Sequence, residues 1–127
     1  MTADPNMSIL VVDDYNTMVR IIRKLLKQIG YENVDEASNG EEALQKYREL
    51  GGGISLLILD VIMPKKSGRE VLEEARLISP DVKAVFTSGY PADLVRKEGF
   101  LEKGLHFLSK PSSPNELLRK VREVLDQ

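Results

Sequence analysis

Short runs of consecutive apolar residues alternate along the chain with longer stretches in which apolar residues recur every three or four positions. Solid runs of this length are typical of strands buried on both faces of a parallel sheet, whereas the three- and four-residue spacing predicts amphipathic helices. Strands are therefore expected from Ser8 to Val12, Val34 to Ala37, Ile54 to Leu59, Val82 to Thr87 and Leu105 to Leu108.

Helical stretches separate and follow these runs, and several carry residues that start or end helices. Asn39 can cap a helix, Ser113 is a cap residue followed by proline, and glycines end two of the patterns. Helices are expected from Thr17 to Ile29, from Asn39 to Gly51–Gly53, from Ser67 and Gly68 onward, after Pro91 as far as Gly99, and from Ser113 to Leu125.

Strands that alternate with helices predict βαβ units and a parallel sheet with helices on both faces. The 127 residues show no internal linker or repeat, so we expect one doubly wound α/β domain with five parallel strands and five helices. Residues 1–6 are polar and are expected to form a flexible tail, which leaves residues 7–127 for the domain.

Composition narrows the class of protein. The net charge of −2 comes from 18 basic and 20 acidic residues spread along the chain, so a nucleic-acid partner is not expected. The absence of cysteine excludes disulfides and thiolate metal sites. The apolar runs are far too short to span a membrane, and the first residues lack the apolar core of a signal peptide. We therefore expect a cytoplasmic protein without a membrane partner.

Polar residues that can bind ligands or take part in a reaction directly follow the expected strands. In open parallel sheets ligands bind outside the carboxyl ends of the strands, so residues at these positions should converge on one edge. They are Asp13 and Asp14 after the first strand, Asp60 after the third, Thr87 and Ser88 at the fourth, and Ser109 and Lys110 after the fifth.

These residue types suit phosphoryl transfer. Three carboxylates in one crevice repel each other, and Mg²⁺ suits a site of few carboxylates completed by water and phosphate oxygens. A lysine and a hydroxyl add the positive charge and the donor that a phosphoryl-transfer site uses for positioning and charge neutralisation. Because a carboxylate can itself be the nucleophile, the product can be an acyl phosphate.

Four segments carry a family resemblance: VVDD at residues 11–14, LILDVIMP at 57–64, TSG at 87–89 and LSKP at 108–111. In this order and spacing they resemble the signatures of CheY-like receiver domains of two-component signalling, which have a flavodoxin-like fold. The resemblance covers essentially the whole chain after its first residues. The first half is similar to free-standing chemotaxis receivers, and Ser88 to Lys110 is similar to receivers of hybrid histidine kinases.

The resemblance implies the roles of the acidic residues. Asp60 would be the phosphoacceptor, Asp14 would bind Mg²⁺ directly, and Asp13 would bind it largely through water. Ile62 would offer its backbone carbonyl to the metal, so its apolar side chain is no objection.

It also implies roles at the fourth and fifth strands. Ser88 would bind a phosphoryl oxygen, Gly89 would leave space beside it, and Lys110 would pair with the phosphoryl group. The bond between Lys110 and Pro111 would be cis. Ser88 and Phe107 would form the switch, although Phe107 lacks the hydroxyl of the commoner tyrosine.

The expected function is that of a phosphorylatable receiver. A histidine kinase or phosphotransfer protein would donate the phosphoryl group, and the fourth helix, fifth strand and fifth helix would bind an unknown downstream protein. Such a domain assists its own phosphorylation and dephosphorylation without being a conventional enzyme.

Two other functions compete with this one. An aspartate-nucleophile, Mg²⁺-dependent phosphatase places a second acid two residues after the nucleophile, where this chain has Ile62. A flavodoxin-like cofactor binder needs a loop rich in serine, threonine or glycine after the first strand, where this chain has Asp13 and Asp14. The single histidine, His106, is expected in a surface or packing role rather than in catalysis.

Overall fold

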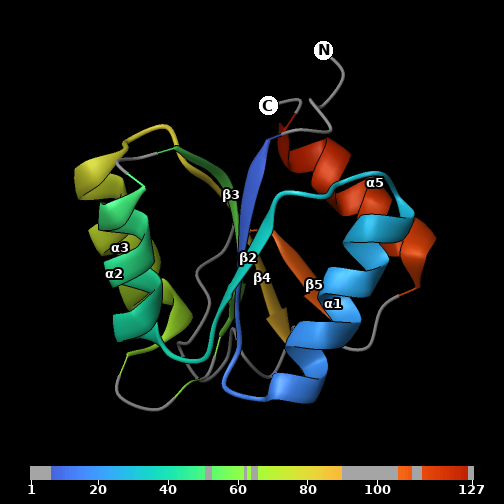
Figure 1. Ribbon diagram of the computed structural model, residues 1–127, viewed down its shortest axis with the longest axis horizontal. Coiled ribbons are helices and arrows are strands. Elements are labelled where there is room, and N and C mark those ends of the chain that lie inside the picture. Colours follow the sequence, from blue (N-terminus) through green and yellow to red (C-terminus); the bar gives the residue numbers. More distant parts are fainter. Residues whose placement is uncertain are drawn as a thin grey trace.

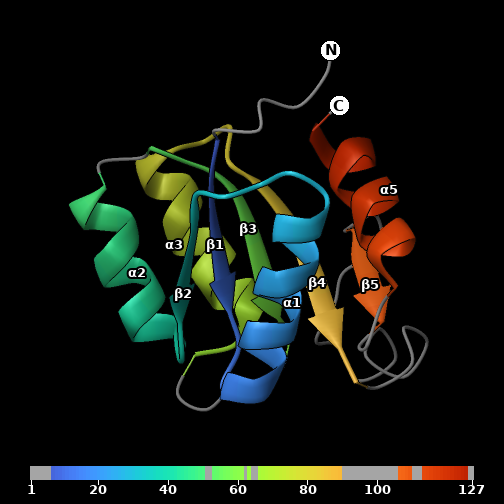
Figure 2. The ribbon, with the colours of Figure 1, turned by 45° about the vertical axis from the view of Figure 1, so that its right-hand side comes forward.

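The computed structural model of the chain describes residues 7–50, 53–61, 63, 66–89, 106–109 and 113–125. It shows a five-stranded parallel sheet in the order β2-β1-β3-β4-β5 (Figure 2). The strands are β1 (Ser8–Val12), β2 (Val34–Ala37), β3 (Ile54–Asp60), β4 (Lys83–Ser88) and β5 (Phe107–Ser109). The helices of the described part are α1 (Asn16–Gln28), α2 (Gly40–Glu49), α3 (Gly68–Ile78) and α5 (Pro114–Leu125).

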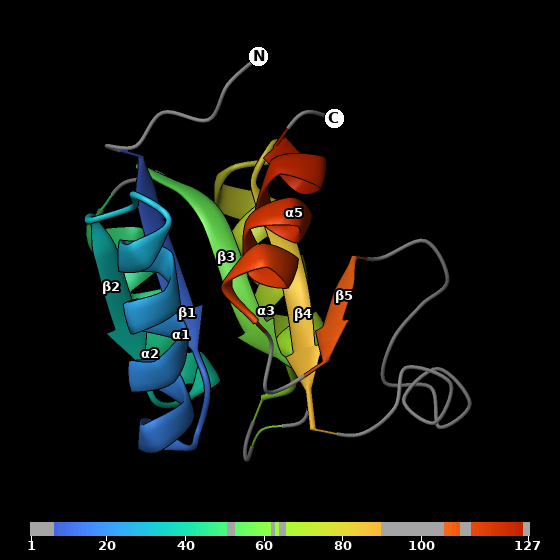
Figure 3. The same ribbon diagram turned by 90° about the vertical axis from the view of Figure 1, so that its right-hand side faces the viewer.

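Helices cover both faces of the sheet. α2 and α3 lie on one face, and α1 and α5 lie on the other (Figures 1 and 3). The strand order reverses at β1, which pairs with β2 on one side and β3 on the other. The doubly wound α/β architecture predicted from the apolar pattern is therefore confirmed. The expected helix after Pro91 lies outside the described residues, as does the expected tail at residues 1–6.

The solid apolar runs are explained by a core on each face of the sheet. In β3, Leu57 belongs to the cluster packed under α2 and α3, whereas its neighbour Ile58 belongs to the cluster under α1 and α5. Both side chains are buried. Burying a side chain of this size contributes about 1.5–3 kcal/mol, so the apolar residues 56–59 of this central strand stabilise both layers.

Strand boundaries differ from the expected ones by a residue or two. β4 begins at Lys83 rather than at Val82, because the Val82 N–H donates to the Ser79 carbonyl in the preceding turn. At its other end β4 includes Ser88, which pairs with Ser109 of β5. The described part of β5 begins at Phe107, and Leu105 lies outside the described residues.

The helix ends follow the expected capping chemistry. Asn39 Oδ1 accepts from the Glu42 N–H at 2.8 Å, and Ser113 Oγ accepts from the Glu116 N–H at 3.1 Å. α1 is followed by Gly30, whose φ of 104° lies in the left-handed region that favours glycine. No helix in the described part of the chain is long and apolar enough to cross a membrane.

Candidate metal centre

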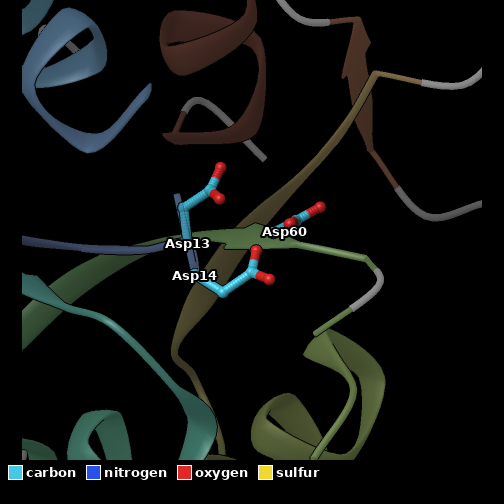
Figure 4. A group of neighbouring side chains, drawn as sticks. All are labelled: Asp13, Asp14 and Asp60. Carbon is cyan, nitrogen blue, oxygen red and sulfur yellow. The ribbon is translucent and has the colours of Figure 1, made fainter. Parts of the chain in front are cut away.

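Three carboxylates meet at the carboxyl edge of the sheet. Val12 of β1 pairs with Leu59 of β3, so Asp13 and Asp60 follow neighbouring positions on adjacent strands. Asp13, Asp14 and Asp60 each offer one carboxylate oxygen, and these oxygens all lie within 4.8 Å of one another (Figure 4). The structure thus brings together the acids that follow the first and third strands.

The cluster runs from the interior to the surface. Asp13 is 1% exposed and Asp60 is 6% exposed, whereas Asp14 lies at the surface. The Asp13 N–H donates to the Ala37 carbonyl of β2 at 3.2 Å, and Asp13 Oδ1 accepts from the Tyr15 N–H at 2.9 Å. Asp13 is therefore held through both its main chain and its side chain.

The donor set fits a hard divalent cation. Oxygen ligands at about 2.0–2.1 Å from an octahedral Mg²⁺ are about 2.9 Å apart when adjacent and about 4.2 Å apart when opposite. The separations within 4.8 Å come close to these values, so small side-chain rotations would complete the geometry. Because like charges at such distances repel strongly where water is excluded, a cation would also stabilise the cluster.

The main chain around Asp60 is fixed from two sides. The Val61 N–H donates to the Thr87 carbonyl of β4 at 2.9 Å, and the Gly68 N–H of α3 donates to the Val61 carbonyl at 3.2 Å. Val61 itself is fully buried. Ile62, expected to offer a carbonyl to the metal, lies outside the described residues.

α3 begins close behind Asp60 and is firmly capped. Ser67 and Glu70 form a reciprocal capping box, in which the Ser67 hydroxyl accepts from the Glu70 N–H and the Glu70 carboxylate accepts from the Ser67 N–H. Just before this cap, Lys66 Nζ donates to Glu74 Oε2 at 2.5 Å. That hydrogen bond raises the pKa of Lys66 above its ordinary value of 10.5, and Lys66 forms an ion pair with Glu74.

Buried hydroxyls end the neighbouring strand. Thr87 pairs with Asp60 across β3 and β4, and its Oγ1 donates to the Leu59 carbonyl at 3.4 Å. Ser88 is 1% exposed and lies one residue further along the same edge. A Cβ atom on Gly89, the residue after Ser88, would meet no described atom within 4 Å. Lys110 and Pro111 lie outside the described residues.

His106 and Phe107, which come before Lys110 and Pro111, contact the neighbouring strand β4. Phe107 is partly buried against the cluster under α2 and α3, and its Cα pairs with that of Phe86. The His106 carbonyl accepts from the Phe86 N–H at 2.9 Å. The hydrogen bond and the charge of Lys120 lower the pKa of Glu123 on α5.

Two residues of the site have no assignment in the sequence analysis. Tyr15 donates its N–H to Asp13, and Gly68 packs against the Asp60 main chain. The sequence could have indicated Tyr15, since it is an aromatic residue that follows the acidic pair just before a helix is expected to begin. It indicates Gly68 less clearly, because glycine occurs near the start of a helix for several different reasons.

Comparison with known proteins agrees with this geometry. Residues 9–122 match the response regulator receiver domain family. The chain is 35% identical over 120 residues to the sensor kinase CckA of Brucella abortus, covering 94% of this chain but only 13% of that kinase. It is 29% identical over 116 residues to the chemotaxis protein CheY of Thermotoga maritima, covering 91% of this chain and 95% of CheY.

A solved structure shows the same likeness in three dimensions. The response regulator protein TrrA of Thermotoga maritima, determined in complex with Mg²⁺ and BeF, superimposes with a TM-score of 0.78 at 35% identity. The superposition covers 92% of this chain and 97% of TrrA.

Proposed function

The chain belongs to the response regulator receiver domain family, and from that premise we propose that Asp60 accepts a phosphoryl group from the phosphohistidine of a histidine kinase or phosphotransfer protein. Receiver domains are signalling modules rather than conventional enzymes. The observation that carries the proposal is the cluster of Asp13, Asp14 and Asp60 at the carboxyl edge of the sheet. We place the reaction in the cytoplasm, with which a chain without cysteine agrees.

The cluster would hold Mg²⁺ through the carboxylates of Asp14 and Asp60, with Asp13 acting largely through water and Ile62 through its backbone carbonyl. The complex of TrrA with Mg²⁺ and BeF supports this assignment by likeness. When bound, the cation supplies neutralisation of the negative charge that develops on the transferred phosphoryl group.

Phosphoryl transfer then depends on how Asp60 is presented. Its carboxylate oxygen attacks phosphorus, the P–N bond to the donor imidazole breaks, and the ring leaves with the electron pair. The hydrogen bonds of Val61 and Gly68 fix the main chain next to Asp60, and the position of the Asp60 Cα atom is therefore fixed as well. Positioning of this kind is the principal contribution a protein makes to phosphoryl transfer.

The remaining site residues would bind the phosphoryl group itself. Ser88 would donate its hydroxyl to one phosphoryl oxygen and the Lys110 ammonium would pair with another, while Gly89 leaves room for both. Movement of Ser88 toward the phosphoryl group would vacate space near β5 that the ring of Phe107 can fill. This change would bias the surface of residues 91–127 toward a state that binds a downstream protein.

The aspartate-nucleophile phosphatase is less well supported. Such an enzyme needs a general acid to protonate its leaving group, and the position two residues after Asp60 is Ile62. Without that acid, release of an alkoxide from a phosphate ester would be slow, whereas transfer from phosphohistidine releases a stable imidazole.

The proposal is tested by incubating the protein with acetyl phosphate and Mg²⁺ and measuring its intact mass. We expect the mass of one phosphoryl group to appear on the wild type and on Asp81→Asn, an exposed carboxylate away from the cluster, but not on Asp60→Asn. Equal phosphorylation of Asp60→Asn and wild type would refute the assignment of the phosphoacceptor.

A further inference from the structure

Tyr15 has a main chain fixed to the acidic cluster. It is the N-cap of α1, with φ −104° and ψ 104°. Its N–H donates to Asp13 Oδ1 at 2.9 Å, and its carbonyl accepts from the N–H groups of Met18 and Val19 at 3.0 and 3.2 Å. The main chain of Tyr15 is therefore fixed by Asp13 on one side and by the first turn of α1 on the other.

The residue type at this position is unfavourable for the local structure. N-cap positions prefer serine, threonine, aspartate or asparagine, and Tyr15 makes no capping bond through its side chain. Tyr15 is 60% exposed, whereas Tyr31 and Tyr47 are 4% and 1% exposed. Tyr15 neither caps the helix through its side chain nor is buried. A residue that departs from local preferences without stabilising the local structure is typical of a functional position.

Tyr15 is an exposed aromatic residue whose main chain is bonded to the acidic cluster, and an aromatic ring offers a flat apolar surface to an incoming ring. Tyr15 directly follows Asp14, the member of the cluster that lies at the surface. Aromatic rings attract each other in stacked or edge-to-face arrangements, and an imidazole is such a ring. A phosphohistidine brings an imidazole to the site as its leaving group, whereas acetyl phosphate brings only a carboxylate.

We propose that Tyr15 packs against the imidazole ring of the phosphodonor while the phosphoryl group passes to Asp60, and so selects imidazole-type donors over acyl phosphates. This inference rests on the proposed function of Asp60. The P–N bond breaks and a P–O bond to Asp60 forms, and the electron pair remains on the ring nitrogen. The ring leaves as neutral imidazole when its other nitrogen carries a proton, so Tyr15 gives up neither a proton nor electrons.

The test compares two small donors on the full chain. Rates of phosphorylation by phosphoimidazole and by acetyl phosphate are measured with Mg²⁺ for wild type, Tyr15→Phe and Tyr15→Ala. An aromatic contact of ordinary strength corresponds to a factor of roughly three to ten in rate. We expect the ratio of the phosphoimidazole rate to the acetyl phosphate rate to fall by about that factor in Tyr15→Ala and to stay unchanged in Tyr15→Phe. Leu77→Ala removes a side chain that is 85% exposed on α3 and serves as the matched control.

Each other outcome overturns the inference in a distinguishable way. An unchanged ratio in Tyr15→Ala means that the ring makes no contact with the donor. An equal loss in Tyr15→Phe and Tyr15→Ala assigns the effect to the hydroxyl, and an equal fall with both donors assigns it to distortion of the cluster. Failure of wild type with both donors refutes the proposed function itself, and the inference with it.

Discussion

Gly68 and Asp60 touch through their main chains, at a distance that leaves no room for a side chain on Gly68. A Cβ atom built on Gly68 would lie 2.4 Å from the Asp60 carbonyl oxygen and 3.2 Å from the Phe86 ring. The Gly68 N–H also donates to the Val61 carbonyl. The start of α3 is therefore packed directly behind the proposed phosphoacceptor, and both contacts depend on the missing side chain.

Replacing Gly68 by alanine should move the start of α3 away from β3. Overpacking of this kind costs about 1–3 kcal/mol, so Gly68→Ala should lower the free energy of unfolding by that order. It should also slow phosphorylation by acetyl phosphate, because Asp60 shares the displaced main chain. Urea denaturation measures the first effect, with Gly89→Ala as the control, since a Cβ there meets no described atom within 4 Å. Equal stability of the two variants would contradict the close contact.

Tyr47 provides a separate test of the core. Tyr47 is a buried residue of α2 that is 1% exposed, and its hydroxyl has no hydrogen-bond partner among the described residues. A buried hydroxyl without a partner costs about 1–3 kcal/mol, so Tyr47→Phe should raise the free energy of unfolding by about 1 kcal/mol. Tyr47→Leu, which also removes ring volume, should lower it. A loss of stability in Tyr47→Phe would show that the hydroxyl is bonded.

The metal site predicts opposite effects of one substitution on binding and on folding. Asp14→Asn removes a charged ligand, and we expect Mg²⁺ affinity to fall by about tenfold or more, since even partners outside the first coordination shell are worth 10- to 100-fold. Without Mg²⁺ the same variant should be more stable than wild type, because one of three mutually repelling charges is gone.

Titration calorimetry gives the affinity, and urea denaturation without Mg²⁺ gives the stability. Asp35→Asn removes an exposed carboxylate of β2 outside the cluster and is the matched control. An affinity of Asp14→Asn equal to that of Asp35→Asn would exclude Asp14 as a ligand.

The switch predicts that chemistry and signalling can be separated. Ser88→Ala should still accept a phosphoryl group on Asp60, because the nucleophile and the metal ligands remain. It should respond weakly across residues 91–127, because the proposed link from the phosphoryl group to Phe107 begins at the Ser88 hydroxyl. Amide chemical shifts with and without beryllofluoride report this response. Ser55→Ala, at the other end of β3, should respond like wild type, and the coupling is wrong if Ser88→Ala does so too.

The sequence was sufficient to predict the layout of the sheet and the meeting of the acids. Residues 56–59 of β3 are apolar at every position because both faces of the sheet are covered, and an acid at the end of this run must lie at the sheet edge. The same reasoning predicts that Asp13 lies next to Asp60, and the pairing of Val12 with Leu59 confirms this. The pattern of apolar residues predicts the strands, and the ends of the strands determine where the acidic residues lie.

Other features depend on contacts that one-dimensional patterns do not contain. Gly68 is required by the approach of α3 to β3, which is set by packing between segments rather than by local preference. β4 begins after Val82 because a turn bond to Ser79 competes with the sheet, although Val82 is apolar and buried. Tyr15 is exposed although it is aromatic, so the spacing of apolar residues could not reveal its place in the structure.

Chemical trapping identifies the residue that carries the phosphoryl group, which we propose to be Asp60. Borohydride reduces an aspartyl phosphate to homoserine, so protein treated with acetyl phosphate and Mg²⁺ can be reduced, digested and sequenced by mass spectrometry. Homoserine at position 60 alone, and only when Mg²⁺ is present, is the predicted result. Homoserine at position 13 or 14, a phosphoryl group on His106, or modification of position 60 without Mg²⁺ would rule out Mg²⁺-dependent phosphorylation of Asp60.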